Sequence, residues 1–128
     1  MPLNLEIKLK FTKKRLNKLS KYKIWTAAST HPGEEYFAAK THILLKKKHK
    51  NLLTIIIPRH INKIKKIKNK LQKLNINVIT HSSKKINWIE PDIYLVDTFG
   101  ESKNFYKISA SVLLGKSIYH SGGQNPLE

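Results

Sequence analysis

Three short polar segments of this 128-residue chain follow apolar, strand-like runs, and they carry most of the side chains that could do chemistry. They are Ser29-Thr30-His31, Arg59-His60 and Asp97-Thr98, with Gly100-Glu101 just beyond the last. In open parallel sheets, ligands bind beyond the carboxyl ends of the strands. If the three runs are parallel strands of one sheet, these segments lie at one edge and predict a shared binding crevice.

Arg59 is distinctive because Arg15 is the only other arginine among the 25 cationic side chains. A guanidinium binds a phosphate or a carboxylate through two parallel hydrogen bonds, which a lysine cannot do. The residue type alone leaves two interpretations open. Either Arg59 binds a ligand phosphate, or it caps its strand or pairs with a surface carboxylate.

Residues 29–35 have the composition of a helix start. Hydroxyl side chains precede Pro32, and the carboxylates Glu34 and Glu35 lie where the positive end of the helix dipole is expected. The free N–H groups of such a start can bind an anion. Because the two carboxylates already occupy that end of the dipole, we favour a simple capped helix over a phosphate site here.

Other chemistries find no support in the spacing. The six histidines show no HExxH or Cys/His pattern, so no metal site is predicted, and we interpret His42 and His49 as a solvated stripe on one helix face. The chain has no GxSxG or GxxxxGK[ST] motif and no carboxylate pair spaced for acid–base work. A Ser29/His60/Asp97 triad is conceivable at the same edge, but nothing favours it over chance. No catalytic residue is predicted in this chain.

The elements that must position these residues alternate along the chain. Apolar and β-branched runs predict strands, and 3.6-residue periodicity predicts helices between them. Strands are expected at Tyr22–Ala28, Leu52–Ile57, Ile76–Thr80, Ile93–Val96 and Ser111–Leu114, and helices from 34 to about 49, at 60–74 and at Glu101–Ile108. Such alternation indicates an α/β fold, a mostly parallel sheet with helices on both faces. Residues 1–21 are expected to form a strand or arm followed by a helical turn.

The composition fits one domain without disulfides, since the chain has no cysteine and a net charge of +17. No apolar run reaches the roughly 20 residues that span a bilayer, and no signal-peptide pattern is present. Lysine, isoleucine and asparagine fill 49 of 128 positions, a skew typical of AT-rich coding sequences that weakens inference from charge. Two charge-based interpretations stay open. One is a basic, non-specific nucleic-acid-binding domain, although no aromatic cluster accompanies the lysines; the other is docking of lysine faces on anionic lipid.

Four motifs, in order and spacing, resemble the donor-binding half of the 3-deoxy-D-manno-octulosonic acid (Kdo) transferases. They are Ala28–Glu35 (ASTHPGEE), Ile57–His60 (IPRH), Val96–Glu101 (VDTFGE) and Gly122–Glu128 (GGQNPLE), and Asn4–Phe11 is similar to the family's domain-entry segment. The chain departs from the usual family residues at Phe99, Ser102, Lys116 and Gln124. The resemblance covers nearly the whole chain.

The resemblance implies a GT-B glycosyltransferase built from two Rossmann-like domains. Such an enzyme moves Kdo from CMP-Kdo onto a lipid A precursor at the cytoplasmic face of the bacterial inner membrane, in lipopolysaccharide biosynthesis, without a metal or other cofactor. Residues 22–128 would be the donor-nucleotide-binding domain without its last strands and helices, and residues 1–21 the entry segment. The acceptor-binding N-terminal domain, which meets lipid A and the anionic membrane surface and holds the catalytic carboxylate, would be missing. The fragment is therefore expected to be soluble, inactive alone and without a specific nucleic-acid partner.

The resemblance also carries site residues onto this chain. Pro58 and Arg59 match the segment that meets the nucleotide, with Arg59 as the phosphate ligand. Further donor-binding positions are Phe99, Gly100 and Glu101, whose backbone would approach the cytidine, and Asn125 and Glu128, whose carboxylate would accept from ribose hydroxyls. Ser29, Thr30 and Glu34 would line the donor crevice.

Overall fold

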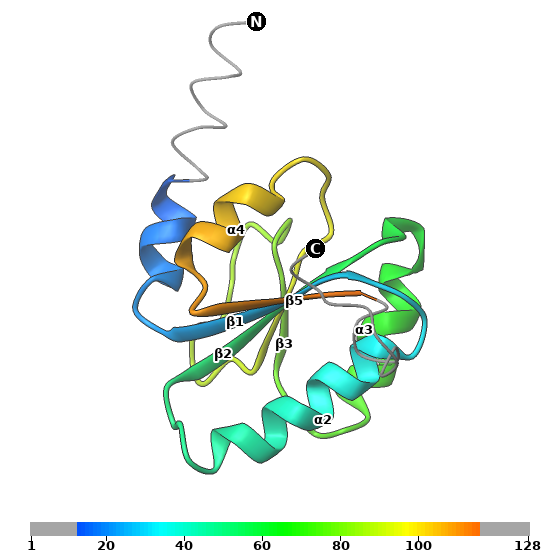
Figure 1. The fold of residues 1–128 in the computed structure, drawn as a ribbon, viewed down its shortest axis with the longest axis horizontal. Coiled ribbons are helices and arrows are strands. Elements are labelled where there is room, and N and C mark those ends of the chain that lie inside the picture. The colour runs from blue at the N-terminus through cyan, green and yellow to red at the C-terminus, as the bar shows by residue number, and fades with distance from the viewer. Residues whose placement is uncertain (1–12, 116–128) are drawn as a thin grey trace, which may run out of the picture.

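The chain folds into a five-stranded, wholly parallel sheet in the order β3-β4-β2-β1-β5, seen in a computed structural model that describes residues 13–115 (Figure 1). A helix over 13–19 comes first. The strands are β1 (Lys23–Thr30), β2 (Leu52–Pro58), β3 (Val78–Thr80), β4 (Ile93–Leu95) and β5 (Ser111–Leu114). The helices are α2 (Glu34–Lys46), η1 (Ile61–Lys63), α3 (Ile64–Gln72) and α4 (Ser102–Ile108).

The two faces of the sheet are covered by different helices. Strand β2 is buried at every position, because each face of this central strand meets a helical layer. Helix 13–19 and α4 cover one face, where Leu19 and Phe105 pack with Tyr94. Helices α2 and α3 cover the other, where Ala38 and Leu71 are among the buried residues (Figure 1). The predicted α/β fold, with helices on both faces of a parallel sheet, is confirmed.

The start of α2 differs from the prediction. Gly33, with φ of 92°, is the N-cap, and no side chain caps the helix, so the expected hydroxyl cap is wrong. Glycine adopts this left-handed conformation without a steric penalty, which lets the chain turn sharply from β1 into the helix. The helix also ends at Lys46 rather than near His49.

The order of the strands creates a switch point between β1 and the edge strand β5. From β1 the chain crosses through α2 to β2 on one side, whereas β5 pairs with β1 on the other side. Crevices form where the connections from neighbouring strands diverge in this way. The loops after β1 and β5 therefore border the predicted crevice, and the loops after β2 and β4 continue its edge. The predicted strand within residues 1–12 and the motif Gly122–Glu128 lie outside the described residues.

Candidate functional site

The three polar segments identified in the sequence meet at the carboxyl edge of the sheet, as expected. Strands β1, β2 and β4 are consecutive neighbours and parallel, so the segments that follow them share this edge. Thr30 pairs with Pro58 in the register of β1 and β2. The backbone N–H of Arg59 donates to the Thr30 carbonyl over 3.0 Å, which ties the first segment to the second.

Arg59 presents a free guanidinium at this edge. The residue is exposed, and its side chain makes no hydrogen bond or ion pair with any residue between 13 and 115. Of the two interpretations of this residue, strand capping and carboxylate pairing find no partner within that part of the chain. A cation that is held at a binding edge by its backbone, with its donors unused, is available to a phosphate.

A buried hydrogen-bond network holds the segment after β4. Arg15 donates to the Tyr94 hydroxyl over 2.8 Å, and that hydroxyl lies 2.5 Å from His81 Nδ1. The opposite ring nitrogen, Nε2, lies 3.0 Å from Glu101 Oε2, which also accepts from the Thr98 hydroxyl over 2.6 Å. With Arg15 donating to Tyr94, the tyrosine proton points to Nδ1, and neutral His81 donates from Nε2 to Glu101. The Glu101 side chain is thus fixed within the protein, and its backbone turn faces outward.

Burial sets the titration of this network. Desolvation lowers the pKa of His81, although the neighbouring Glu101 opposes that shift. Burial also raises the pKa of Tyr94 to about 12, while Arg15 acts in the opposite direction. Both groups are therefore neutral near pH 7, which suits the direction of hydrogen bonding inferred above.

The turn between β4 and α4 exposes the predicted nucleotide-facing residues. Phe99 is 80% exposed, and Gly100 has φ of +81°, a conformation that L side chains rarely adopt. Thr98 and Glu101 anchor the two ends of this turn through their shared hydrogen bond. A ring and a backbone that stand out from an anchored turn can contact a flat ligand such as a nucleobase.

The conceivable Ser29/His60/Asp97 triad does not form. The Asp97 carboxylate accepts from the backbone N–H of Ser82 and from its hydroxyl. Ser29 and His60 are exposed, and no hydrogen bond joins any two of the three residues. These positions carry no catalytic constellation.

At the switch point, Glu34 has a structural role that the sequence did not reveal. Its side chain is fully buried, and Oε1 accepts from the backbone N–H of His31 over 2.7 Å. A Cβ added to Gly115 would lie 1.9 Å from the Ser29 carbonyl oxygen and 3.2 Å from Glu34 Oε1. Ser29 itself has φ of 53°. The loops after β1 and β5 therefore touch here, and Glu34 stabilises the turn that leads into α2.

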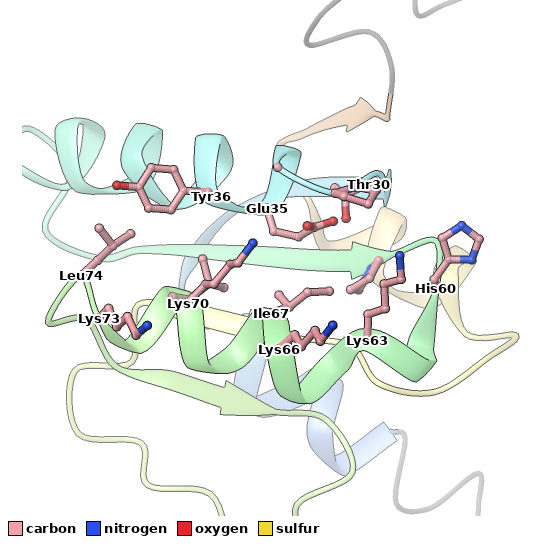
Figure 2. Close-up of a pocket in the computed structure, with 14 residues that line it drawn as sticks. Thr30, Glu35, Tyr36, His60, Lys63, Lys66, Ile67, Lys70, Lys73 and Leu74 are labelled. Carbon is pink, nitrogen blue, oxygen red and sulfur yellow. The ribbon is translucent and has the colours of Figure 1, made fainter.

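A cavity of about 720 Å³ opens from this edge into the groove between α2 and α3 (Figure 2). Two of the predicted site residues line it, Thr30 and Pro58. Four lysines line it as well, Lys63, Lys66, Lys70 and Lys73. Sequence reasoning placed these lysines on a solvated helix face, because helical periodicity does not show what stands opposite that face. Arg59 and the turn at residues 98–101 do not line this cavity.

One interpretation of the histidines is wrong. His42 is fully buried instead of lying on a solvated stripe, with Nδ1 2.7 Å from the Thr54 hydroxyl and Nε2 3.1 Å from Asp92 Oδ1. Asp92 also accepts from Lys46 over 2.9 Å, and these hydrogen bonds hold its pKa well below the ordinary value despite burial. Thr54 and His42 are both inaccessible, so this hydroxyl–imidazole–carboxylate chain joins α2, β2 and the segment before β4 and does no chemistry.

Neither a membrane-spanning helix nor a group of metal-ligating side chains is found within residues 13–115. No helix there is long and apolar enough to cross a membrane. The same stretch contains no group of three or more histidine, aspartate or glutamate side chains that could hold a metal ion.

The sequence is similar to several proteins of known description. It is 36% identical over 105 residues to 3-deoxy-D-manno-octulosonic acid transferase of Haemophilus influenzae, a match that covers 82% of this chain and 25% of the relative. A Rickettsia bellii protein of the same description is 31% identical over 128 residues, covering all of this chain and 29% of the relative. A probable mitochondrial transferase of that description from Arabidopsis thaliana is 34% identical over 101 residues, 78% of this chain and 23% of the relative. Over most of its length, the chain is similar to one part of these Kdo transferases.

A solved structure shares this fold. It is the C-terminal CMP-Kdo binding domain of WaaA from Acinetobacter baumannii, with a TM-score of 0.71 over 84% of this chain and 58% of that one, at 24% identity. The likeness shows that the fold is shared with a Kdo transferase domain. No family model matches the chain. The chain spans about a quarter of the length of the curated Kdo transferases that it matches.

Proposed function

We propose that this chain is the CMP-Kdo-binding part of a Kdo transferase that transfers Kdo to a lipid A precursor in lipopolysaccharide biosynthesis. The observation that carries the proposal is the Arg59 guanidinium, which has no side-chain partner within residues 13–115. It follows β2 at the carboxyl edge, and the neighbouring strand β4 leads into the anchored turn that exposes Phe99 and Gly100. The relatives are transferases of this description, and the structural neighbour is named as a CMP-Kdo binding domain.

Each residue has a role in this proposal. Arg59 binds the donor phosphate through its two-pronged guanidinium. Phe99 and the backbone of Gly100 contact the cytosine, while Glu101 holds their turn. Asn125 and Glu128, outside the described residues, complete the site at the ribose. Ser29, Thr30 and Glu34 shape the loop after β1 from which the crevice begins.

The fragment is proposed to be inactive alone. The matches cover 25% and 29% of the relatives, and the resemblance puts the catalytic carboxylate and the acceptor site in the other domain. The parent enzyme would work at the cytoplasmic face of the bacterial inner membrane, where exposed lysines add affinity for anionic lipid of about 1 kcal/mol each. Donor binding is proposed to need no metal, so CMP affinity should be the same in EDTA and in Mg²⁺.

The test is an amide-resolved NMR titration with CMP, with AMP as the control nucleotide, in 150 mM salt. We expect a Kd of about 1 mM, roughly −4 kcal/mol, because the other domain does not close over the ligand. Shifts should concentrate at Arg59 and residues 98–101 and be larger for CMP than for AMP. Arg59→Ala should weaken CMP binding about tenfold or more, whereas the matched loss of charge in Lys65→Ala should leave it unchanged. Equal, diffuse shifts for both nucleotides would overturn the proposal.

A further inference from the structure

Of the residues that line the groove between α2 and α3, only Thr30 and Pro58 are also assigned to the donor site. Lys63, Lys66, Lys70 and Lys73 recur at helical spacing along η1 and α3 and form one wall (Figure 2). All four are exposed, and none forms an ion pair with another residue in 13–115. The row extends over about 15 Å at 1.5 Å per residue. One wall of the groove is thus cationic along its whole length.

The inner end of the groove carries two polar groups that are removed from solvent. Thr30 is 2% exposed, and its hydroxyl makes no well-formed hydrogen bond with any described residue, although it lies close enough to the Glu35 carboxyl to lower the pKa of that group. Glu35, also buried, lies beside it, and both side chains point toward the groove (Figure 2). A buried hydroxyl without a well-formed hydrogen bond costs free energy, about 1–3 kcal/mol, that a bound ligand can recover.

Among residues 13–115, Glu35 is the one acidic side chain that lines the cavity. Burial raises its pKa, with Glu34 adding to the shift and Thr30 and His31 opposing it. The carboxyl group can therefore accept hydrogen bonds or, when protonated, also donate one. Next to the Thr30 hydroxyl, such a group suits the alternating donors and acceptors of a sugar. It does not suit a bare phosphate.

Between the polar inner end and the lysine wall, the groove is lined by apolar side chains. Pro58, Ile67 and Leu71 are among its apolar lining residues. Tyr36 and Leu74 lie at the end of the groove away from Thr30 (Figure 2). The apolar face of a pyranose or furanose ring can pack on such side chains while its hydroxyls reach the polar wall. A volume of about 720 Å³ lies within the range of small-molecule sites.

We propose that the α2–α3 groove is a second ligand site, which adjoins the donor edge at Thr30 and Pro58 and binds a phosphorylated monosaccharide. The sugar hydroxyls meet Thr30 and Glu35 at the inner end, and the phosphate lies on Lys66 and Lys70. The ring covers the apolar side chains. Neither the relatives' descriptions nor the proposed function assigns a ligand to this face, and the proposal does not depend on CMP binding.

Glucose 6-phosphate is the probe, titrated by NMR at constant ionic strength, with glucose and inorganic phosphate as controls. We expect saturable shifts at Thr30, Glu35 and the α3 lysines, and binding at least tenfold tighter than that of either control. Thr30→Val, which removes this hydroxyl and keeps the shape, should weaken binding about fivefold, equal to about 1 kcal/mol. Since it removes a buried group that lacks a well-formed hydrogen bond, the unliganded variant should keep or raise its Tm, so loss of folding cannot explain the result.

The lysines are tested by charge-matched variants. Lys66→Gln with Lys70→Gln should weaken binding about tenfold, whereas Lys50→Gln with Lys65→Gln, equal in charge but outside the groove, should not. The proposal would be overturned if inorganic phosphate bound as tightly as glucose 6-phosphate, or if Thr30→Val bound glucose 6-phosphate with unchanged affinity.

The two sites are separated by cross-titration. Arg59→Ala should weaken CMP and leave glucose 6-phosphate unaffected, and the two ligands should bind together. Competition, with CMP shifting Thr30 and Lys66, would make the groove the donor pocket and overturn the second site. Binding of glucose 6-phosphate without any CMP binding would overturn the proposed function and leave this inference standing.

Discussion

The Arg15 side chain links three segments of the protein through its hydrogen bonds. Its guanidinium donates to the carbonyls of His81 and Ser83 and to the Tyr94 hydroxyl. It therefore joins helix 13–19 to the segment after β3 and to β4. In sequence it is one cation among 25, and nothing at residues 13–19 marks it as buried.

Replacing Arg15 by alanine should lower the free energy of unfolding by about 2–3 kcal/mol. The change removes charge-assisted hydrogen bonds and leaves a buried hydroxyl and two carbonyls without this donor. Urea denaturation followed by circular dichroism measures the effect. Lys14→Ala, an exposed cation on the same helix, should change stability by less than about 0.5 kcal/mol. Equal effects of the two variants would contradict a buried network.

The lowered pKa of His81 predicts that the protein loses stability on mild acidification. Its pKa is lowered in the folded protein, where Arg15, Tyr94, Glu101 and Asp97 surround it. Between that lowered pKa and the ordinary 6.5, the unfolded chain binds more protons than the folded one. Stability therefore falls as the pH drops below about 6.5.

Urea denaturation at pH 7.5, 6.5 and 5.5 measures this dependence. His81→Asn should flatten the curve across that window, although the variant is less stable at every pH. His49→Asn, a change at an exposed histidine, should keep the wild-type slope. A slope unchanged in His81→Asn would show that another group titrates there.

At the scale of the elements, the contact between the loops after β1 and β5 depends on Gly115. An alanine Cβ would meet the backbone oxygen of Ser29 at 1.9 Å, and backbone cannot move aside as a flexible side chain can. Gly115→Ala should therefore destabilise the protein by about 3 kcal/mol through overpacking and should displace β5 from β1.

Gly100→Ala is the matched control for Gly115→Ala. No atom lies within 4 Å of a Cβ at Gly100, and its φ of +81° alone disfavours alanine. The expected cost is about 1 kcal/mol. Chemical denaturation of both variants compares steric with conformational effects, and a larger cost at Gly100 would contradict the close approach at the switch point.

At the scale of the whole molecule, the net charge of +17 predicts two kinds of anion binding with different salt responses. Binding of a 20-nucleotide single strand should be non-specific and fall by roughly 10³ or more between 50 and 200 mM salt. CMP carries one phosphate, so its affinity should change only about threefold over the same range. Fluorescence anisotropy and NMR measure the two affinities. Strand binding that persists at 200 mM salt would favour a nucleic-acid-binding domain instead.

The order and type of the elements could be predicted because each of them is encoded locally. Leu52–Ile57 is nearly continuously apolar and β-branched, which is typical of a strand covered on both faces, and β2 is buried throughout. The alternation of strands and helices, which is interrupted between β3 and β4, then implies a mostly parallel sheet, whose carboxyl ends share an edge. The meeting of the segments at Thr30, Arg59 and Thr98 follows from that topology alone.

What only the tertiary structure decided is which polar side chains are used within the protein and which are left for ligands. In the sequence, Glu34, Glu101 and Arg59 are all charged residues near the end of a predicted strand. In the structure, both carboxylates accept hydrogen bonds from the protein, whereas the Arg59 guanidinium has no such partner within residues 13–115. His42 reads as a surface residue until β2 brings Thr54 against it. This partner of His42 lies 12 residues away and one partner of Glu101 lies 20 residues away, and local patterns carry no information on such partners. The lysine row of α3 likewise becomes the wall of a groove only because α2 packs beside it.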